Sequence, residues 1–246
     1  MMQVTALYRH PIKSHGREAM DRVRLEAGQS MPNDRRWAVA HDNAKADGTK
    51  WAPCANFSIG SKAPQLAAIN AVLDDATDTV TLTHPDRDPL TIHPMRDAEQ
   101  LIAWVMPLVP QDRALPAQVM ELVGRGFTDA PFASISLNSV ASHRAVEALA
   151  QSALSHLRWR GNIWFAGAAA WDEFEWLDRD LALGGAVLRV KERIKRCKAT
   201  TANPETGARD VDTLRALNIL GHQDFGVYVE VTQSGEIAVG DQLELL

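Results

Sequence analysis

Residues 186–207 read AVLRVKERIKRCKATTANPETG and place a cysteine inside the densest run of positive charge in the chain. Apolar residues alternate with basic ones along this segment, which is the pattern of a strand with one buried face. We therefore predict one long strand over 186–201, followed by a turn at NPETG, because proline presets φ and glycine accepts a positive φ. Without a bulge, Leu188 and Ile194 would lie on the buried face, and Cys197 would share the other face with several cations.

A cysteine among basic residues has a chemistry that a buried cysteine lacks. Nearby positive charge favours the thiolate over the thiol. A thiolate can act as a nucleophile, a redox sensor or a soft metal ligand. The surrounding cations also suit an anion such as a phosphate. The alternative is a solvated edge strand whose charges resist aggregation, and spacing alone leaves both interpretations open.

Length and composition limit the class of protein. The chain has 246 residues, which corresponds to one large domain or two of ordinary size. Its net charge of −5 argues against binding of nucleic acid or membranes through overall positive charge. The two cysteines cannot form a disulfide framework, and no apolar stretch resembles a signal peptide or a membrane span. We therefore expect a cytoplasmic protein without nucleic-acid or membrane partners.

Short apolar runs separated by turn residues predict a mainly β protein with some α structure. Strands are predicted over residues 4–12, 23–27, 37–41, 79–84, 158–167 and 186–201, with a closing hairpin over 225–246. Helices are predicted where a capping side chain precedes an apolar periodic run, after Asp97, after Asn138 or Ser139, and after Asp212. A proline-rich stretch at 107–118 is the expected boundary between two barrel-like domains, residues 1–115 and 116–246.

Further polar and basic residues gather at the ends of predicted strands. They are Lys13 and Ser14 in PIKS, Arg35 in NDRRW, and Arg158, Arg160 and Asn162 in RWRGN. Each of them alone is typical of a surface ion pair. Their joint occurrence at strand ends favours one anionic ligand held between the two halves of the chain.

These motifs together resemble the MOSC domain, named after the C-terminal domain of molybdenum cofactor sulfurases, preceded by its N-terminal β-barrel domain. VTALYRHPIKS and GQSMPNDRRWAV resemble the first domain, whereas RGNIWFAG, RIKRCKATTANPETG and VGDQLELL resemble the second. The most specific element is the cysteine followed by two threonines and a Pro-x-Thr-Gly turn. The arrangement is similar to that of the mitochondrial amidoxime-reducing component and its bacterial relatives.

The resemblance implies a fold, a cofactor and a set of site residues. The fold is a MOSC β-barrel preceded by a smaller β-barrel-like domain, and the cofactor is a pyranopterin molybdenum cofactor. Cys197 matches the family cysteine whose thiolate binds molybdenum. The other implied cofactor contacts are Lys13 and Ser14 at the phosphate end, Arg35, Ser136, Arg160, Asn162 and Lys195. Pyridoxal phosphate binding is a further expectation at the level of the family.

The chain also departs from the family pattern. His15 follows the Lys-Ser pair where many relatives carry cysteine, and an arginine usual after the strand at 37–41 is missing. The loop at 51–64 is therefore altered where substrate or cofactor would approach. Cys54 in this loop is interpreted as a packed or loop cysteine rather than a second ligand. The chain has no ferredoxin-like cysteine cluster, so electrons are expected from separate proteins of the ferredoxin or flavoprotein type.

Three functions follow as hypotheses. The first is reduction of small N-hydroxylated molecules, in which the protein binds, orients and tunes a molybdenum cofactor. The second is a sulfur carrier or cofactor-transfer protein that uses a persulfide on Cys197. The third is a binding domain that has lost the cofactor, which the altered loop at 51–64 motivates.

Overall fold

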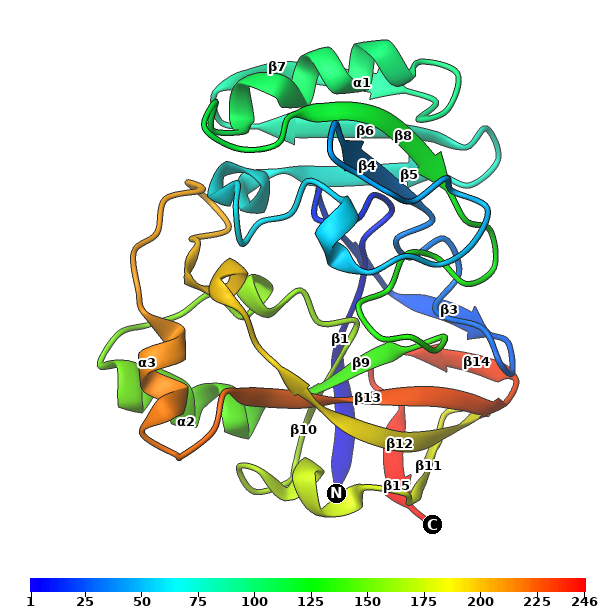
Figure 1. The fold of residues 1–246 in the computed structure, drawn as a ribbon. Coiled ribbons are helices and arrows are strands. Elements are labelled where there is room, and N and C mark those ends of the chain that lie inside the picture. Colours follow the sequence, from blue (N-terminus) through cyan, green and yellow to red (C-terminus); the bar gives the residue numbers. More distant parts are fainter.

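The computed structural model describes residues 1–246, and its largest element is a closed barrel of seven strands (Figure 1). The strands follow the order β10-β9-β13-β12-β11-β15-β1, and β1 pairs with β10 to close the ring. Inward side chains such as Leu7, Leu137, Leu188 and Val229 form one apolar core. The barrel strands are β1 (Met2–Arg9), β9 (Ile135–Ser139), β10 (Ile163–Ala166), β11 (Asp180–Leu183), β12 (Ala186–Lys195), β13 (Asp224–Gln233) and β15 (Gln242–Leu245).

A second group of sheets lies above the barrel in Figure 1, under helix α1 (Ala98–Val105). Its strands are β4 (Trp37–His41), β5 (Asn70–Asp74), β6 (Thr79–His84), β7 (Arg87–Ile92) and β8 (Pro116–Glu121). β4 pairs with β8, while β5, β6 and β7 form an antiparallel sheet around a core that contains Trp37, Val80 and Leu101. The predicted fold class, mainly β with some α and built on a β-barrel, is confirmed.

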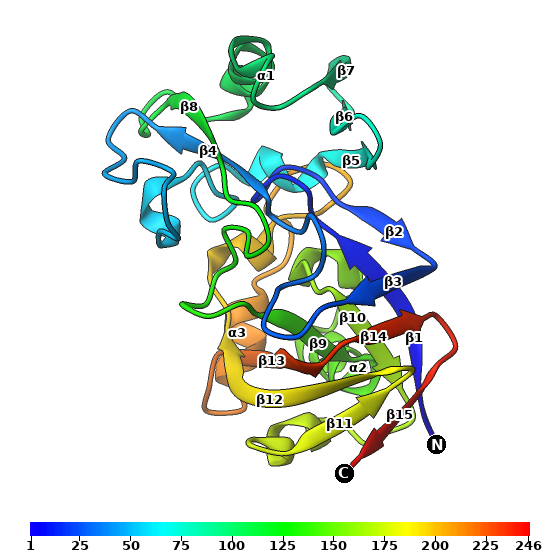
Figure 2. The same cartoon turned by 90° about the vertical axis from the view of Figure 1, so that its right-hand side faces the viewer.

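Strand pairing connects the N-terminal and C-terminal halves of the chain. β1 is one of the strands of the large barrel, and β2 (Glu18–Met20) pairs with it and extends that sheet (Figure 2). β3 (Arg22–Leu25) pairs with β14 (Gly235–Ala238), and β8 pairs with β4. The domain boundary between residues 115 and 116 stays a prediction.

Two of the three predicted helices have the side-chain caps expected of them. Ser139 accepts a hydrogen bond from the Ser142 amide at 3.3 Å at the start of α2 (Val140–Ala150). Asp212 accepts one from the Arg215 amide at 3.0 Å at the start of α3 (Thr213–Asn218). At α1, Asp97 is the N-cap residue but makes no such bond. Short 3-10 turns cover Cys54–Asn56, Pro64–Ala68, Met106–Leu108, His156–Trp159, Asp172–Trp176 and Lys198–Thr201.

Two of the predicted strands, 158–167 and 186–201, are much shorter in the structure. β12 stops at Lys195, because the chain then turns at Cys197 into the 3-10 turn Lys198–Thr201. Bulges interrupt the alternation of β12 between Val190 and Lys195. β10 begins only at Ile163, since the chain before it forms a 3-10 turn that ends at Arg160 with a φ of +51°.

The closing hairpin predicted over 225–246 is wrong. β14 leaves β13 and pairs with β3, and β15 pairs with β11 and β1. Closure of the barrel requires β15 to fill the gap between β11 and β1, so the last strands separate instead of pairing with each other.

Candidate functional site

Most of the predicted site residues meet in one cavity of about 540 Å³, lined by residues of the barrel and of the segments near the smaller sheets. Seven of the eight line it: Lys13, Ser14, Arg35, Ser136, Arg160, Lys195 and Cys197. Asn162 is not part of the lining and lies behind Ser136. The cavity wall also contains residues that were not predicted as ligands, among them Cys54, Asp129, Glu192, Arg196 and Tyr228.

Cys197 is held at the cavity by the threonines that follow it. The residue is extended, with a φ of −118°, and its side chain is exposed. Its carbonyl accepts hydrogen bonds from the amide and the hydroxyl of Thr200, at 3.2 and 3.1 Å. The Thr200 hydroxyl also bonds that of Thr213 at 2.6 Å. The Cys-x-x-Thr spacing therefore fixes the backbone that presents the thiol.

Two arginines also hold the turn at Lys198–Thr201 in place through hydrogen bonds. Arg158 donates to the carbonyls of Thr200 at 3.1 Å and Ala202 at 3.3 Å, and pairs with Asp210 at 3.1 Å. Arg209 donates to Thr201 Oγ1 at 2.6 Å and to the carbonyl of Ser61, in the loop at 51–64, at 2.8 Å. Arg158 was expected to share a ligand-binding face with Arg160, but most of its guanidinium instead holds the turn in place.

Arg160 and Arg196 are half-buried cations that line the cavity and have no carboxylate partner. Arg160 donates to the carbonyl of Gly16 at 3.1 Å. Arg196 donates to the carbonyls of Trp159 at 2.8 Å and Phe225 at 2.9 Å, and to a side-chain amide oxygen at 3.0 Å. Burial lowers the pKa of Arg160 to about 9 and that of Arg196 to about 10. Since a partly desolvated charge without a counter-ion is costly, both positions suit an anionic ligand.

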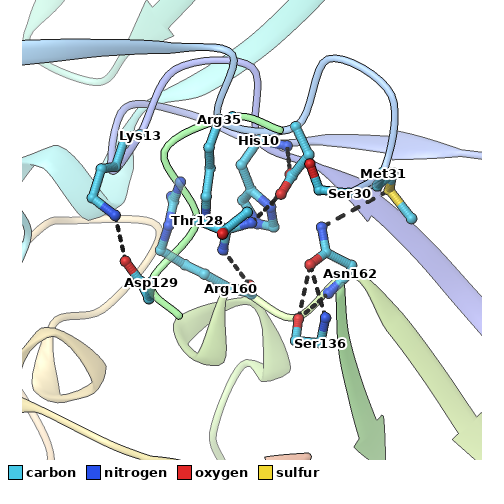
Figure 3. Close-up of polar contacts among 12 residues, drawn as sticks. His10, Lys13, Ser30, Met31, Arg35, Thr128, Asp129, Ser136, Arg160 and Asn162 are labelled. Atoms are coloured by element: carbon cyan, nitrogen blue, oxygen red, sulfur yellow. Dashed lines mark hydrogen bonds and ion pairs between the residues drawn. The ribbon is translucent and has the colours of Figure 1, made fainter. Parts of the chain in front are cut away.

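Arg35 is oriented by a buried acidic neighbour. Its guanidinium pairs with Asp34 and donates to the carbonyl of Arg160 at 3.2 Å (Figure 3). Asp34 also accepts from the backbone amide of His10 at 2.8 Å and contacts the His10 ring at 3.2 Å. Burial acts to raise the pKa of Asp34, but the Arg35 charge and the His10 hydrogen bonds hold it below its ordinary value. Arg36, by contrast, pairs outside the cavity with acidic surface residues.

Lys13 reaches the cavity but is already paired. Its side chain is 2% exposed, and its ammonium donates to the carbonyl of Phe127 at 2.7 Å and to the carboxylate of Asp129 (Figure 3). The thiol of Cys54 donates to the same carboxylate at 3.0 Å. Burial and the Asp129 charge raise the pKa of Cys54 to about 11, so this second cysteine stays a thiol near neutral pH. Asp129 lies in an irregular loop without a motif, so no sequence signal marked it.

Ser136 and Asn162 form a structural link at the cavity floor. The Ser136 hydroxyl donates to the Asn162 side-chain oxygen at 2.9 Å, and the backbone amide of Asn162 donates to that hydroxyl at 2.8 Å (Figure 3). Asn162 further donates to the carbonyl of Tyr8 at 3.2 Å, which ties β1 to this corner. Its contacts therefore support Ser136, which alone of the two faces the cavity.

His15, which follows the Lys13–Ser14 pair, does not line the cavity. It is fully buried, and its Nδ1 donates to the carbonyl of Lys13 at 2.6 Å. Burial lowers the pKa of His15 to about 4, so the ring is neutral near pH 7. His15 therefore helps to fix the Lys13–Ser14 turn, in which Ser14 has a φ of +63°.

Comparison with known sequences identifies the family of the chain. The family model of the MOSC domain matches residues 125–244, and that of the MOSC N-terminal beta barrel domain matches residues 1–108. The chain therefore belongs to the MOSC-domain proteins that carry an N-terminal MOSC β-barrel domain. Membership of this family is consistent with binding of a molybdenum cofactor. The ligand-binding roles of the individual cavity residues stay predictions.

Two solved structures show a distant likeness. The YUAD protein of Bacillus subtilis is 13% identical, with a TM-score of 0.47, and the match covers 100% of this chain and 96% of that one. YiiM of Geobacillus stearothermophilus is 18% identical, with a TM-score of 0.36, over 46% of this chain and 53% of that one. No curated protein matches the sequence. In the structure, none of the helices has the length and hydrophobicity needed to cross a bilayer, and the cytoplasmic location stays a prediction.

Proposed function

We propose that this protein binds a pyranopterin molybdenum cofactor in the cavity and reduces small N-hydroxylated compounds. Cys197 would be the protein's ligand to the metal, and electrons would come from separate proteins of the ferredoxin or flavoprotein type. The observation that carries the proposal is the convergence of one exposed thiol and two uncompensated guanidiniums on one cavity.

The residues present fit the chemistry of such a cofactor. A thiolate is a soft ligand that suits molybdenum, and a phosphate group suits arginine and lysine. Arg160 and Arg196 have no carboxylate to neutralise them. A ligand with at least one strongly charged anionic group would neutralise these two guanidiniums. The volume of about 540 Å³ lies in the range typical of cofactor sites.

Each residue would contribute binding, orientation or charge. Cys197 would present its thiolate from a backbone that Thr200 fixes. Arg160 and Arg196 would hold the anionic part of the cofactor, and Ser136 would offer a hydroxyl to its polar edge. When bound, the cofactor supplies the two-electron chemistry that breaks an N–O bond. The rest of the site would serve to exclude water and to orient the substrate.

The first experiment measures molybdenum per chain in protein from a host that makes the cofactor. We expect near-stoichiometric metal in the wild type, loss in Cys197→Ser and retention in Cys54→Ser, the matched control in the same cavity. Protein that contains metal should then reduce an N-hydroxylated amidine with a chemical reductant. Unchanged metal content and turnover in Cys197→Ser would contradict the role of Cys197.

A sulfur carrier is the second candidate, and the exposure of the Cys197 thiol favours it. A persulfide on Cys197 would use the same cationic surroundings without a metal. Mass spectrometry of the intact chain distinguishes the two functions. An added sulfur atom on Cys197 in protein without molybdenum would support the carrier, whereas molybdenum without added sulfur supports the reductase.

A further inference from the structure

We infer that Asp129 is an internal competitor for the anion that the cavity binds, because its carboxylate already pairs with the ammonium of Lys13. The inference rests on the proposed function only in that the ligand carries a phosphate group. Asp129 would thereby lower the affinity of the cavity for anions. The cations named here differ in whether a carboxylate already neutralises them. Arg160 and Arg196 are available to a ligand, whereas Lys13 must first exchange one carboxylate for another anion.

The contacts of Lys13 show which of its partners can be replaced. Its ammonium donates to the Phe127 carbonyl at 2.7 Å, and this backbone contact positions the cation. The second contact is with the Asp129 carboxylate, whose side chain is 47% exposed. A ligand that enters the cavity can therefore reach the Asp129 side of Lys13, while the Phe127 side stays closed.

The backbone around Asp129 is fixed, but its carboxylate is not held by its own loop. Trp51 Nε1 donates to the carbonyl of Thr128 at 2.8 Å, and the Phe127 amide donates to the carbonyl of Arg35 at 2.8 Å. The carboxylate itself has two partners, Lys13 and Cys54. Rotation of this side chain would therefore release Lys13 without unfolding the loop.

The cavity carries more positive than negative side chains, so one carboxylate that pairs with a cation changes how strongly an anion binds. Partial desolvation in the cavity acts to raise the pKa of Asp129, but Lys13 and Arg35 together hold it below its ordinary value, so the competitor is ionised near neutral pH. The wall carries seven cationic side chains and two carboxylates, Asp129 and Glu192. Only Asp129 of these two is paired with a cation of the cavity. A multiply charged anion such as pyrophosphate can displace the Asp129 carboxylate, since such an anion forms favourable charge interactions with Arg160 and Arg196 as well as with Lys13.

The test titrates inorganic pyrophosphate into the full chain, produced without the cofactor, and follows binding by isothermal calorimetry. We expect Asp129→Asn to bind pyrophosphate about tenfold more tightly than the wild type, because Lys13 then has no carboxylate partner. Glu192→Gln is the matched control, since it removes the same charge from the same wall without releasing Lys13. We expect this control to change the affinity by less than about threefold. Asp129→Ser replaces Asp129→Asn if the asparagine variant does not fold.

A second set of variants, made in the Lys13→Met protein, distinguishes competition at Lys13 from a general effect of the net charge. In Lys13→Met, Asp129→Asn should produce no further gain in affinity, as expected for two residues that act through one contact. An Asp129→Asn affinity equal to the wild type, an equal gain with Glu192→Gln, or a full gain in the Lys13→Met background would each overturn the inference. A wild type without molybdenum would reject the proposed function but leave the pyrophosphate result unaffected.

Discussion

The guanidinium of Arg196 lies 5.6 Å from the centre of the Trp159 ring and donates to the Trp159 carbonyl at 2.8 Å. Trp159 in turn stacks on Phe225, with ring centres 4.0 Å apart and planes at 15°. Arg196 also donates to the carbonyl of Phe225. The residue directly before Cys197 is therefore a positive charge held rigidly by two aromatic residues, and not a mobile surface cation.

This relationship predicts an effect on the reactivity of the thiol. Removing the fixed charge in Arg196→Met should slow the alkylation of Cys197 by iodoacetate about tenfold, because the guanidinium beside the thiol attracts the anionic reagent. The rate is measured with iodoacetate, and mass spectrometry assigns the modified cysteine. Arg189→Gln on the preceding strand β12 is the control, because Arg189 pairs with Asp180 away from the cavity. Equal rates in both variants would show that Arg196 does not promote the reaction.

Removal of Arg158 should destabilise the turn that carries Cys197. Arg158→Met leaves the buried carbonyls of Thr200 and Ala202 without donors, which should cost about 2–3 kcal/mol in the free energy of unfolding. Urea unfolding measures this loss, with the exposed Arg113→Met as control. A change as small as that of the control would mean that other contacts hold the turn.

Glu173 should make the stability of the fold depend on pH. It is fully buried beside the N-terminus of α2, where the Ser142 hydroxyl donates to it at 2.7 Å. Burial raises the pKa of Glu173 to about 7 from an ordinary 4.5, although the Ser142 hydrogen bond opposes the shift. The folded state therefore binds more protons than the unfolded state between about pH 4.5 and 7, so stability falls as pH rises through this range.

The corresponding variant is Glu173→Gln, which keeps the hydrogen-bond acceptor and removes the titration. We expect it to be more stable than the wild type at pH 8 by about 2–3 kcal/mol and to lose most of the pH dependence between pH 5 and 8. Urea unfolding at several pH values checks this. A variant that keeps the full pH dependence would assign it to other groups.

Two glycines with similar backbone angles should respond differently to alanine. Gly126 has a φ of +64°, and a Cβ there would lie 2.2 Å from the backbone carbonyl oxygen of Asp34. The side-chain carboxylate of Asp34 orients Arg35. Gly221 has a φ of +80° but open space around it. Gly221→Ala should lower the free energy of unfolding by about 1 kcal/mol from backbone strain alone. Gly126→Ala should lower it by about 3 kcal/mol, because the added Cβ also clashes. Thermal unfolding compares them, and equal losses would show that the Asp34 contact relaxes freely.

Local patterns in the sequence account for much of the fold and for the composition of the site. The caps at Ser139 and Asp212 depend on neighbouring residues only, so their chemistry is readable from the chain itself. The alternation that begins at Ala186 likewise predicts a strand with one buried face. The separation of β14 from β15 depends on barrel closure, and no local pattern contains that information.

The sequence by itself determined which chemical groups the protein carries, among them a thiol in a basic segment and several cations at strand ends. Only the tertiary structure decided how these cations are used. Lys13 meets Asp129 across 116 positions of the chain, and Arg158 holds a turn that begins about 40 residues later, while Arg160 and Arg196 are left without a carboxylate. The reason is physical: pairing and burial depend on which distant segments meet, whereas strand and cap patterns depend on residues a few positions apart.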